Sequence, residues 1–314
     1  MKILNDSSEV SVDTGNKNQD SFEWDTDYRY LNEVLDSFSS RIDSKLLSIV
    51  IPVYNEEKTI RKVLEQLPKN KSIEIILVDD HSSDNSLDEI EKAKIVNKVR
   101  VIRHEKNQGY GSALLTGINH ATGYIVVTMD SDGQHRPEDI FYLVNPIFKK
   151  EADITVGSRY YGTYNYRLPV STRLGEAIIE KFMFICFGQK VANNQGGFRA
   201  FHKKTLKIFK DIKFKDYAFT TELLFKASLS KFKIKECPIH LVDREYGASK
   251  IVLSKLVLSL LLCVAYYTIQ RINSPYYNKW MIKRFNFIKK LPIYREQKSI
   301  ESITPKLDHI VFFP

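Results

Sequence analysis

The sequence has few cysteines, and they are not arranged as pairs or as metal ligands. Cys186, Cys237 and Cys263 are odd in number and widely spaced. Disulfide frameworks and zinc sites require paired or closely spaced cysteines. The pattern therefore predicts neither, which suits a reducing compartment. The first residues, "MKILNDSSEV", also lack the basic and then apolar pattern of a secretory signal.

The sequence also lacks the glycine-rich loops that hold phosphates through the backbone. The first predicted strand runs into "YNEE", which contains no glycine. The stretch "NQGYGSALLTG" has a Gly-x-Gly, but Leu114 occupies the place of the third glycine of a dinucleotide fingerprint. No Gly-x-x-x-x-Gly-Lys stretch occurs. Nicotinamide- or flavin-type cofactors and P-loop nucleotide binding are therefore set aside.

Acidic residues are outnumbered, since the formal net charge is +9 over 314 residues. This balance suits an acidic partner, such as a nucleotide phosphate, a nucleic acid or an anionic membrane. With 43% hydrophobic residues, the chain can bury the core of one large domain with extensions.

The charge and the hydrophobicity divide the chain into four parts. Residues 1–45 hold ten Asp or Glu against five Lys or Arg, which predicts a flexible acidic leader with a short helix around 30–38. Residues 46–250 form the predicted folded domain. Residues 251–298 are apolar and then basic and aromatic, and residues 299–314 form a tail.

Short apolar, β-branched runs alternate with helical patterns through the first half of the predicted domain. The expected strands cover residues 47–55, 73–80, 99–105 and 124–130, and helical spacing covers residues 60–67, 86–95 and 111–121. This alternation predicts a Rossmann-like, three-layer α/β/α sandwich with a mainly parallel sheet. Later strands are expected at 153–160 and 233–244, where the looser pattern predicts a partly mixed sheet.

Polar and acidic residues gather where the predicted strands end. Sheets of this kind bind ligands at the carboxyl ends of their strands. The residues at these ends are Tyr54, Asn55, Glu56, Asp79, Asp80, Asp130 and Asp132.

The stretch "MDSDGQH" carries the clearest chemical signal. Asp130 and Asp132 are two residues apart, so both carboxylates can lie on the same side of an extended chain. Carboxylates are hard oxygen ligands that suit Mg²⁺ or Mn²⁺. Gly133 allows the backbone to turn close to a ligand. Because no backbone cradle is present, we expect a diphosphate to be held by such a cation together with Arg or Lys. The alternative is an acidic turn beyond a strand.

The C-terminal part favours a membrane surface. Lys255 interrupts the apolar run 251–269 and leaves 14 uninterrupted residues, whereas a spanning helix needs about 20. Residues 274–298 then carry seven Lys or Arg against one Glu, mixed with aromatic residues. We expect C-terminal apolar and amphipathic helices that associate with the membrane peripherally or by shallow insertion. The alternative is a core helix followed by a solvated basic tail.

Eight motifs together resemble one enzyme family. In order they are "IVIPVYNEE", "ILVDDHSSDNS", "NQGYGSAL", "MDSDGQH", "VGSRY", "GGFRAF", "TTELLFKA" and "DREYGASK". Over residues 46–252 the chain resembles the family 2 glycosyltransferases with the GT-A fold. Within that family it is most similar to the polyprenyl-phosphate sugar transferases, the dolichyl-phosphate mannose synthase group, and "DREYGASK" narrows it to these.

The resemblance implies roles for particular residues. The donor-binding positions would be Pro52, Tyr54, Glu56, Asp80, Asp130 and Arg159. The metal-binding positions would be Asp130, Asp132 and Gln134. The catalytic positions would be Asp132, Arg244, Lys250 and Glu222.

Basic residues are the expected partners of phosphate groups. Arg159, Arg244 and Lys250 are candidates for the diphosphate and the acceptor phosphate, because Arg offers a planar fork and Lys a mobile charge. Arg167 and Arg173 fall on the expected acceptor loop. Each could instead be a solvated surface charge.

Two positions depart from the family pattern. Asn193 stands where the family commonly has Asp, and His81 stands where a small residue is frequent. The missing carboxylate matters little if the acceptor is a lipid phosphate, whose second pKa of about 6 leaves it ionised at neutral pH. A hydroxyl acceptor would need a base, and Glu222 is then the remaining candidate.

We therefore expect an inverting, Mg²⁺- or Mn²⁺-dependent transferase at the cytoplasmic membrane face. It would move a hexose, in the first place mannose from GDP-mannose, onto dolichyl or another polyprenyl phosphate. The nearest alternative uses UDP-glucose or another donor, with polyprenyl phosphate or a glycan hydroxyl as acceptor. Further alternatives are a basic nucleic-acid-binding protein, against which the acidic strand ends argue, and an inactive scaffold.

Overall fold

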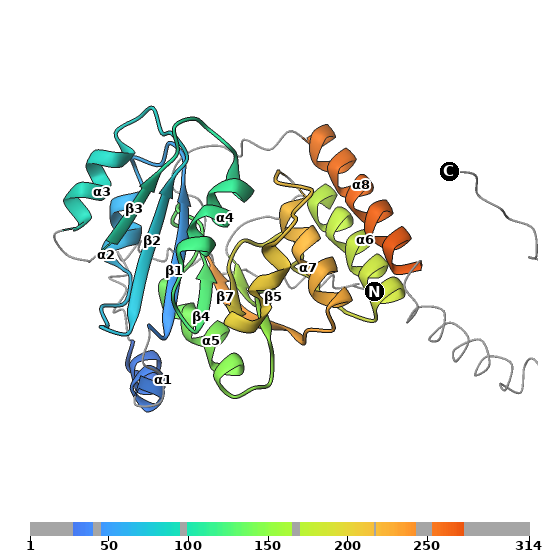
Figure 1. The fold of residues 1–314 in the computed structure, drawn as a ribbon, viewed down its shortest axis with the longest axis horizontal. Coiled ribbons are helices and arrows are strands. Elements are labelled where there is room, and N and C mark those ends of the chain that lie inside the picture. The colour runs from blue at the N-terminus through green and yellow to red at the C-terminus, as the bar shows by residue number, and fades with distance from the viewer. Residues whose placement is uncertain are drawn as a thin grey trace, which may run out of the picture.

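A seven-stranded sheet forms the centre of the protein (Figure 1). The computed structural model describes residues 28–39, 45–94, 99–164, 170–216, 218–242 and 253–272. The strand order is β3-β2-β1-β4-β6-β5-β7. Only β6 runs antiparallel to its neighbours, so the predicted mainly parallel, partly mixed sheet is confirmed. The strands are β1 (Leu47–Val53), β2 (Ile73–Asp79), β3 (Val99–Arg103), β4 (Ile125–Thr128), β5 (Ile154–Tyr164), β6 (Arg199–His202) and β7 (Ile234–Leu241).

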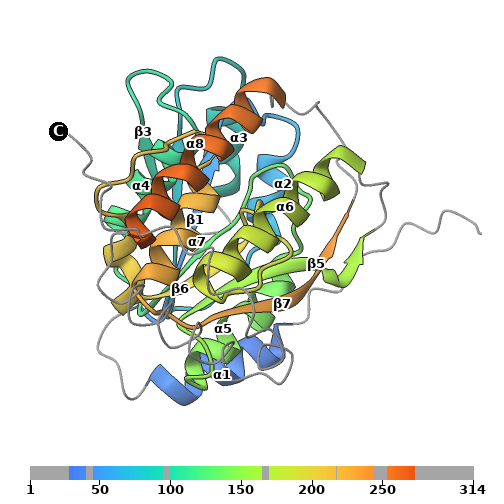
Figure 2. The same cartoon turned by 90° about the vertical axis from the view of Figure 1, so that its right-hand side faces the viewer.

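Helices cover both faces of the sheet, which gives the predicted three layers. One hydrophobic cluster joins the sheet to α1 (Arg29–Ser39), α2 (Ile60–Glu65), α3 (Ser86–Lys94) and α5 (Ile140–Phe148). A second cluster joins the other face to α4 (Tyr110–His120) and α7 (Phe219–Leu229). A third cluster joins α7 to α6 (Val170–Phe187) and α8 (Leu253–Ile272). Figures 1 and 2 both show α6 and α8 side by side, outside α7.

Strand β1 illustrates why the sequence forms this sheet. All seven of its residues are buried, and it lies between β2 and β4 with helices above and below. A strand with both faces covered needs a nearly continuous run of Val, Ile and Leu rather than an alternating pattern. The sequence "LSIVIPV" meets this requirement.

The N-terminal leader contains an ordered part of the domain. The helix expected around 30–38 is present as α1, and its Leu31 and Leu35 are buried in the first cluster. The Tyr28 hydroxyl also donates to the carbonyl of Gln66. Helix α1, which the sequence analysis counted with the leader, therefore packs on the core of the domain.

The second half of the domain contains elements that the sequence pattern did not reveal. Helix α6 and strand β6 fall in the region where the periodicity loosens. Helix α8 occupies most of the apolar run. Within the described residues, no helix combines the length and the hydrophobicity needed to cross a bilayer.

Helix α4 approaches the sheet through a glycine, which gives a test of the packing. A Cβ on Gly117 would lie 2.3 Å from Cγ1 of Val50 and 3.2 Å from Cγ2 of Val78, whereas a Cβ on Gly175 in α6 would meet nothing within 4 Å. We expect Gly117→Ala to lower the free energy of unfolding by about 1–3 kcal/mol through overpacking. The matched change Gly175→Ala should be neutral or stabilise by up to about 1 kcal/mol. Urea denaturation measures both, and equal effects would contradict this packing.

Candidate active site

The site begins where β1 and β4 separate, and Pro52 marks the place. Peptide groups of successive residues in β1 point alternately to its two neighbours. The Val50 carbonyl accepts from the N–H of Met129 on the β4 side, and the Val53 carbonyl accepts from the N–H of Asp80 on the β2 side. Pro52 thus faces the β4 side after the ladder has ended at Val50, so its missing N–H costs no ladder bond. This is the switch point at which open α/β sheets bind ligands.

The loop after β1 is fixed against the loop after β2. The Asn55 N–H donates to Ser82 Oγ at 3.0 Å, and the Glu56 N–H donates to Ser86 Oγ at 2.8 Å. Both loops need a left-handed residue, since φ is 56° at Asn55 and 65° at His81. A positive φ favours glycine, which accounts for the small residue that the family pattern has at position 81. Tyr54 is half-exposed at the same strand end.

The predicted metal ligands lie directly after β4. Asp130 is 29% exposed at its side chain, and its Oδ1 accepts the hydroxyl of Tyr110 at 2.8 Å. Its Oδ2 lies 3.8 Å from Nδ1 of His135. Asp132 is buried, and its Oδ1 accepts the N–H of Gln134 at 3.1 Å. The two carboxylates therefore stand at the switch point on a turn that the chain itself holds in shape.

The turn after β4 is joined to the end of β7. Gly133 has φ 77°, which requires a glycine in practice. The Gln134 Nε2 donates to the carbonyl of Val242, and the Val242 N–H donates to the carbonyl of Gln134, both at 3.1 Å. The side-chain amide of Gln134 is thus oriented by β7, and its role as a metal ligand stays a prediction.

Asp80 is an internal anchor in this structure. It is buried, and its two oxygens accept the N–H groups of Gln108 and Gly109 at 2.8 and 2.7 Å. Oδ1 also lies 2.7 Å from Nδ1 of His104. Its carboxylate therefore fixes the loop that leads into α4. The predicted role of Asp80 in binding the donor must compete with these bonds.

Three further residues surround Asp130 and were not singled out in the sequence. Burial raises the pKa of Tyr110 well above its ordinary value, and the neighbouring charge of Asp130 adds to this. Arg199 is fully buried and donates to three backbone carbonyls at 2.8 Å. Burial lowers the pKa of Arg199 to about 10, so it remains a cation at neutral pH. A Cβ on Gly197 would lie 2.3 Å from the Tyr110 hydroxyl and 2.6 Å from Oδ1 of Asp130, so only glycine allows this packing.

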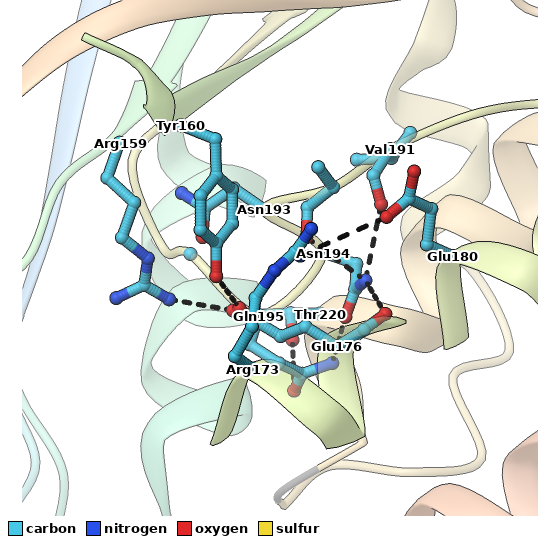
Figure 3. Close-up of polar contacts among 12 residues, drawn as sticks. Arg159, Tyr160, Arg173, Glu176, Glu180, Val191, Asn193, Asn194, Gln195 and Thr220 are labelled. Carbon is cyan, nitrogen blue, oxygen red and sulfur yellow. Dashed lines mark hydrogen bonds and ion pairs between the residues drawn. The ribbon is translucent and has the colours of Figure 1, made fainter. Parts of the chain in front are cut away.

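Arg159 on β5 belongs to a second group of polar side chains, formed between β5 and α6 (Figure 3). Its Nη2 donates to Oε1 of the buried Glu176 at 2.7 Å, and the hydroxyl of Tyr160 donates to the other oxygen of the same carboxylate. The guanidinium of Arg173 lies 4.3 Å from the centroid of the Tyr160 ring. Burial, followed by the bond to Glu176, raises the pKa of Tyr160 to about 12. This group fixes two arginines beside one tyrosine.

The departure at position 193 has a local cause. Asn193 Nδ2 donates to the carbonyl of Gly157 at 2.6 Å, and the N–H groups of Ala192 and Asn193 both donate to Glu236 at 2.9 Å. An Asp at 193 could not make the first bond and would add a carboxylate near Glu236. The amide therefore suits this loop.

Glu222 is not placed as a base, which corrects the expectation from the sequence. Its side chain is fully buried and accepts from the N–H groups of Lys213 and Phe214 and from the hydroxyl of Tyr267 on α8. These donors and the burial leave no exposed oxygen for a substrate. Glu222 instead joins α7, the preceding loop and α8.

Three predicted residues, Arg167, Arg244 and Lys250, lie outside the described residues. The described segment 218–242 ends at Val242, which is bound to Gln134 and lies two residues before Arg244. Their roles remain predictions.

The residues after β4 suit a divalent cation only if a bound ligand supplies further oxygen atoms to it. In the parts of the chain that the structure describes, no three His, Cys, Asp or Glu side chains form a group that could hold a metal ion. Asp130 and Asp132 are the two carboxylates of this turn. Mg²⁺ typically binds one or two carboxylates and completes its shell with water and substrate phosphates. The donor set therefore suits a cation that arrives with a diphosphate.

The mainly parallel sheet, with polar strand ends at a switch point, is typical of the class of α/β proteins that bind ligands at this edge of the sheet. Comparison with known families makes this specific. The model of "Glycosyl transferase family 2" matches residues 48–209. The chain belongs to this family and is a glycosyltransferase, which argues against the nucleic-acid-binding alternative.

Two curated relatives align with this chain over most of their own length. A UDP-N-acetylglucosamine–dolichyl-phosphate N-acetylglucosaminyltransferase of Methanococcus voltae is 34% identical over 224 residues, which is 66% of this chain and 89% of the relative. An uncharacterised protein of Methanocaldococcus jannaschii is 33% identical over 216 residues, or 67% of this chain and 87% of that protein.

Solved structures support the fold. Glucosyl-3-phosphoglycerate synthase from Mycobacterium tuberculosis, in complex with Mn²⁺, uridine diphosphate-glucose and phosphoglyceric acid, has a TM-score of 0.57 at 22% identity. The match covers 75% of this chain and 84% of that one. The same enzyme was also crystallised with Mg²⁺ and uridine diphosphate, with a TM-score of 0.55 at 19% identity and coverage of 75% and 83%. The predicted GT-A fold class is confirmed.

Replacing Glu222 tests its structural role. Glu222→Gln removes an acceptor from buried donors, so we expect the free energy of unfolding to fall by about 1–3 kcal/mol. The control Glu180→Gln breaks contacts of 3.9 and 3.8 Å to Arg173 and Lys190, which are exposed, and should change it by less than about 1 kcal/mol. Urea denaturation and turnover well below the melting temperature separate the roles. Unchanged stability with abolished turnover would restore Glu222 as a base.

Proposed function

We propose that this glycosyltransferase moves a sugar from a nucleotide-sugar onto a polyprenyl phosphate. The observation that carries the proposal is the Methanococcus voltae relative, which matches over 89% of its length and whose name specifies both a nucleotide-sugar and dolichyl phosphate. That relative uses UDP-N-acetylglucosamine, so this donor now ranks ahead of GDP-mannose, which the sequence motifs first favoured. UDP-glucose is the third candidate.

The geometry supports a phosphate rather than a hydroxyl as the acceptor. A lipid monophosphate has a second pKa of about 6 and is already a nucleophile at neutral pH. It needs no base, which agrees with Glu222 being buried and saturated with donors. One phosphate oxygen would attack the anomeric carbon with inversion as the bond to the nucleoside diphosphate breaks. Arg159 and Arg173, on either side of Tyr160, are suited to holding the attacking anion.

The acidic turn after β4 supports the other half of the reaction. When bound at Asp130 and Asp132, Mg²⁺ or Mn²⁺ would offset the charge that develops on the departing diphosphate. The chain's own contribution is to hold these carboxylates rigidly, through Tyr110, Gly197 and the turn at Gly133. Rigid, preorganised charge is a large part of enzymatic stabilisation.

An assay with separate donors tests the function. Full-length protein is mixed with vesicles containing dolichyl phosphate, Mn²⁺ and one labelled donor, UDP-N-acetylglucosamine, GDP-mannose or UDP-glucose, and the lipid extract is counted. We expect label in the lipid from UDP-N-acetylglucosamine. Asp130→Asn should lower the rate about 100-fold or more, while the exposed control Asp36→Asn should not. No lipid-linked label with any donor would refute the proposal.

The outer face of α6 and α8 is suited to be a membrane-binding surface. The two helices lie side by side (Figure 2), and both carry large exposed apolar side chains at helical spacing. They are Leu174, Ile178, Phe182, Phe184 and Ile185 on α6, and Val257, Leu258, Leu261, Leu262, Tyr266 and Ile269 on α8. The basic, aromatic residues 274–298 follow α8 directly in the sequence and suit anionic lipid head groups. A bilayer would cover this face and bring the lipid acceptor to the enzyme.

Flotation with anionic vesicles tests this membrane-binding surface. We expect Ile178→Glu combined with Ile185→Glu to lower the vesicle-bound fraction about tenfold or more, since burying each side chain contributes about 1.5–3 kcal/mol. The control Tyr142→Glu changes an exposed aromatic residue on α5, which packs on the opposite face of the sheet. If the double change on α6 leaves vesicle binding unaltered, α6 is not part of the membrane-binding surface.

A further inference from the structure

Tyr110 occupies a position that no known property of the site explains. It opens α4, and its hydroxyl donates to Oδ1 of Asp130 at 2.8 Å. Its ring is partly exposed, whereas its hydroxyl lies deep beside Gly197. A tyrosine is not needed to start a helix, so its value at this position lies in the bond to the carboxylate.

The surrounding chain holds Tyr110 in place from behind. Asp80 accepts the N–H groups of Gln108 and Gly109, the two residues before it. Gly109 has φ 89°, a conformation that brings the chain into the helix at this angle. The N–H of Gly111 donates to the carbonyl of Lys215 at 3.2 Å. Tyr110 is therefore fixed by backbone bonds on both sides.

The carboxylate of Asp130 is held from the front as well. The backbone of Gly197 is so close that a Cβ there would lie 2.6 and 2.8 Å from its two oxygens. The ring of His135, 3.8 Å from Oδ2, packs on Phe198 with centroids 4.8 Å apart. The hydroxyl of Tyr110 supplies a hydrogen bond to Oδ1 of this carboxylate at 2.8 Å, with good geometry. A directional bond of this kind favours one orientation of the carboxylate.

We propose that Tyr110 is a positioning residue that orients Asp130 for the divalent cation. Groups that hydrogen-bond a metal ligand fix its orientation, and their loss typically weakens metal binding 10- to 100-fold. The inference rests on the proposed function, because it assumes that Asp130 binds the cation that accompanies the donor. It also assigns a role to Asp80, whose bonds to the N–H groups of Gln108 and Gly109 hold Tyr110 in place.

Metal titration of one conservative variant tests the inference. Tyr110→Phe keeps the ring and removes only the donor, and Tyr142→Phe, on the exposed surface of α5, is the matched control. Binding of Mn²⁺ to the full-length protein is followed by electron paramagnetic resonance, with and without UDP. We expect Tyr110→Phe to weaken Mn²⁺ binding about 10- to 100-fold in the presence of UDP, and Tyr142→Phe to leave it unchanged.

A second readout separates positioning from a general loss of structure. If orientation is the cause, turnover of Tyr110→Phe recovers when the Mn²⁺ concentration is raised by the factor lost in affinity. Mn²⁺ affinity within twofold of the unmodified protein, or a loss of turnover that Mn²⁺ does not restore, would overturn the inference. So would an unmodified protein that binds no Mn²⁺ with UDP. Mn²⁺ binding that depends on Tyr110 without any sugar transfer to lipid would instead overturn the proposed function alone.

Discussion

Two carboxylates at the end of one buried strand repel each other, and much of the site can be understood from how the fold holds them there. Asp130 and Asp132 follow β4 at the point where β1 and β4 separate, so both stand beside an opening in the sheet. The Tyr110 hydroxyl and the buried cation Arg199 reduce the electrostatic cost at Asp130, and the turn at Gly133 keeps Asp132 in place. A pair of carboxylates held in this way is suited to a cation carrying a diphosphate.

The sequence predicted the first half of the fold well because its signals there are local. The apolar run of β1 and the helical spacing before Pro68 follow from the covered faces of a parallel sheet, and β1 to β4 lie within a residue or two of where the pattern put them. The second half was harder. Strand β6 has four residues, and α6 presents apolar side chains both to the core and outward, so neither has a clean period. The packing of α1 on the core depends on tertiary contacts that the acidic composition around it conceals.

The site was predicted in part. Asp130, Asp132 and Tyr54 lie where their motifs put them, at adjacent strand ends. The role of Glu222 could not be predicted, because a motif does not tell which way its side chain faces. Here the carboxylate faces the N–H groups of Lys213 and Phe214 rather than a substrate. Tyr110, Arg199 and Glu176 were missed because their importance comes from partners 20, 21 and 17 residues away in the chain. Two of the three fall inside the quoted motifs, which was the only available signal.

The most direct test of the account is the position of the metal. Crystals of the full-length protein soaked with Mn²⁺ and UDP-N-acetylglucosamine would be measured at the manganese absorption edge. The account predicts one anomalous peak between the carboxylates of Asp130 and Asp132, within coordination distance of the donor's diphosphate oxygens. A peak elsewhere, or a bound donor with no manganese at these carboxylates, would contradict it.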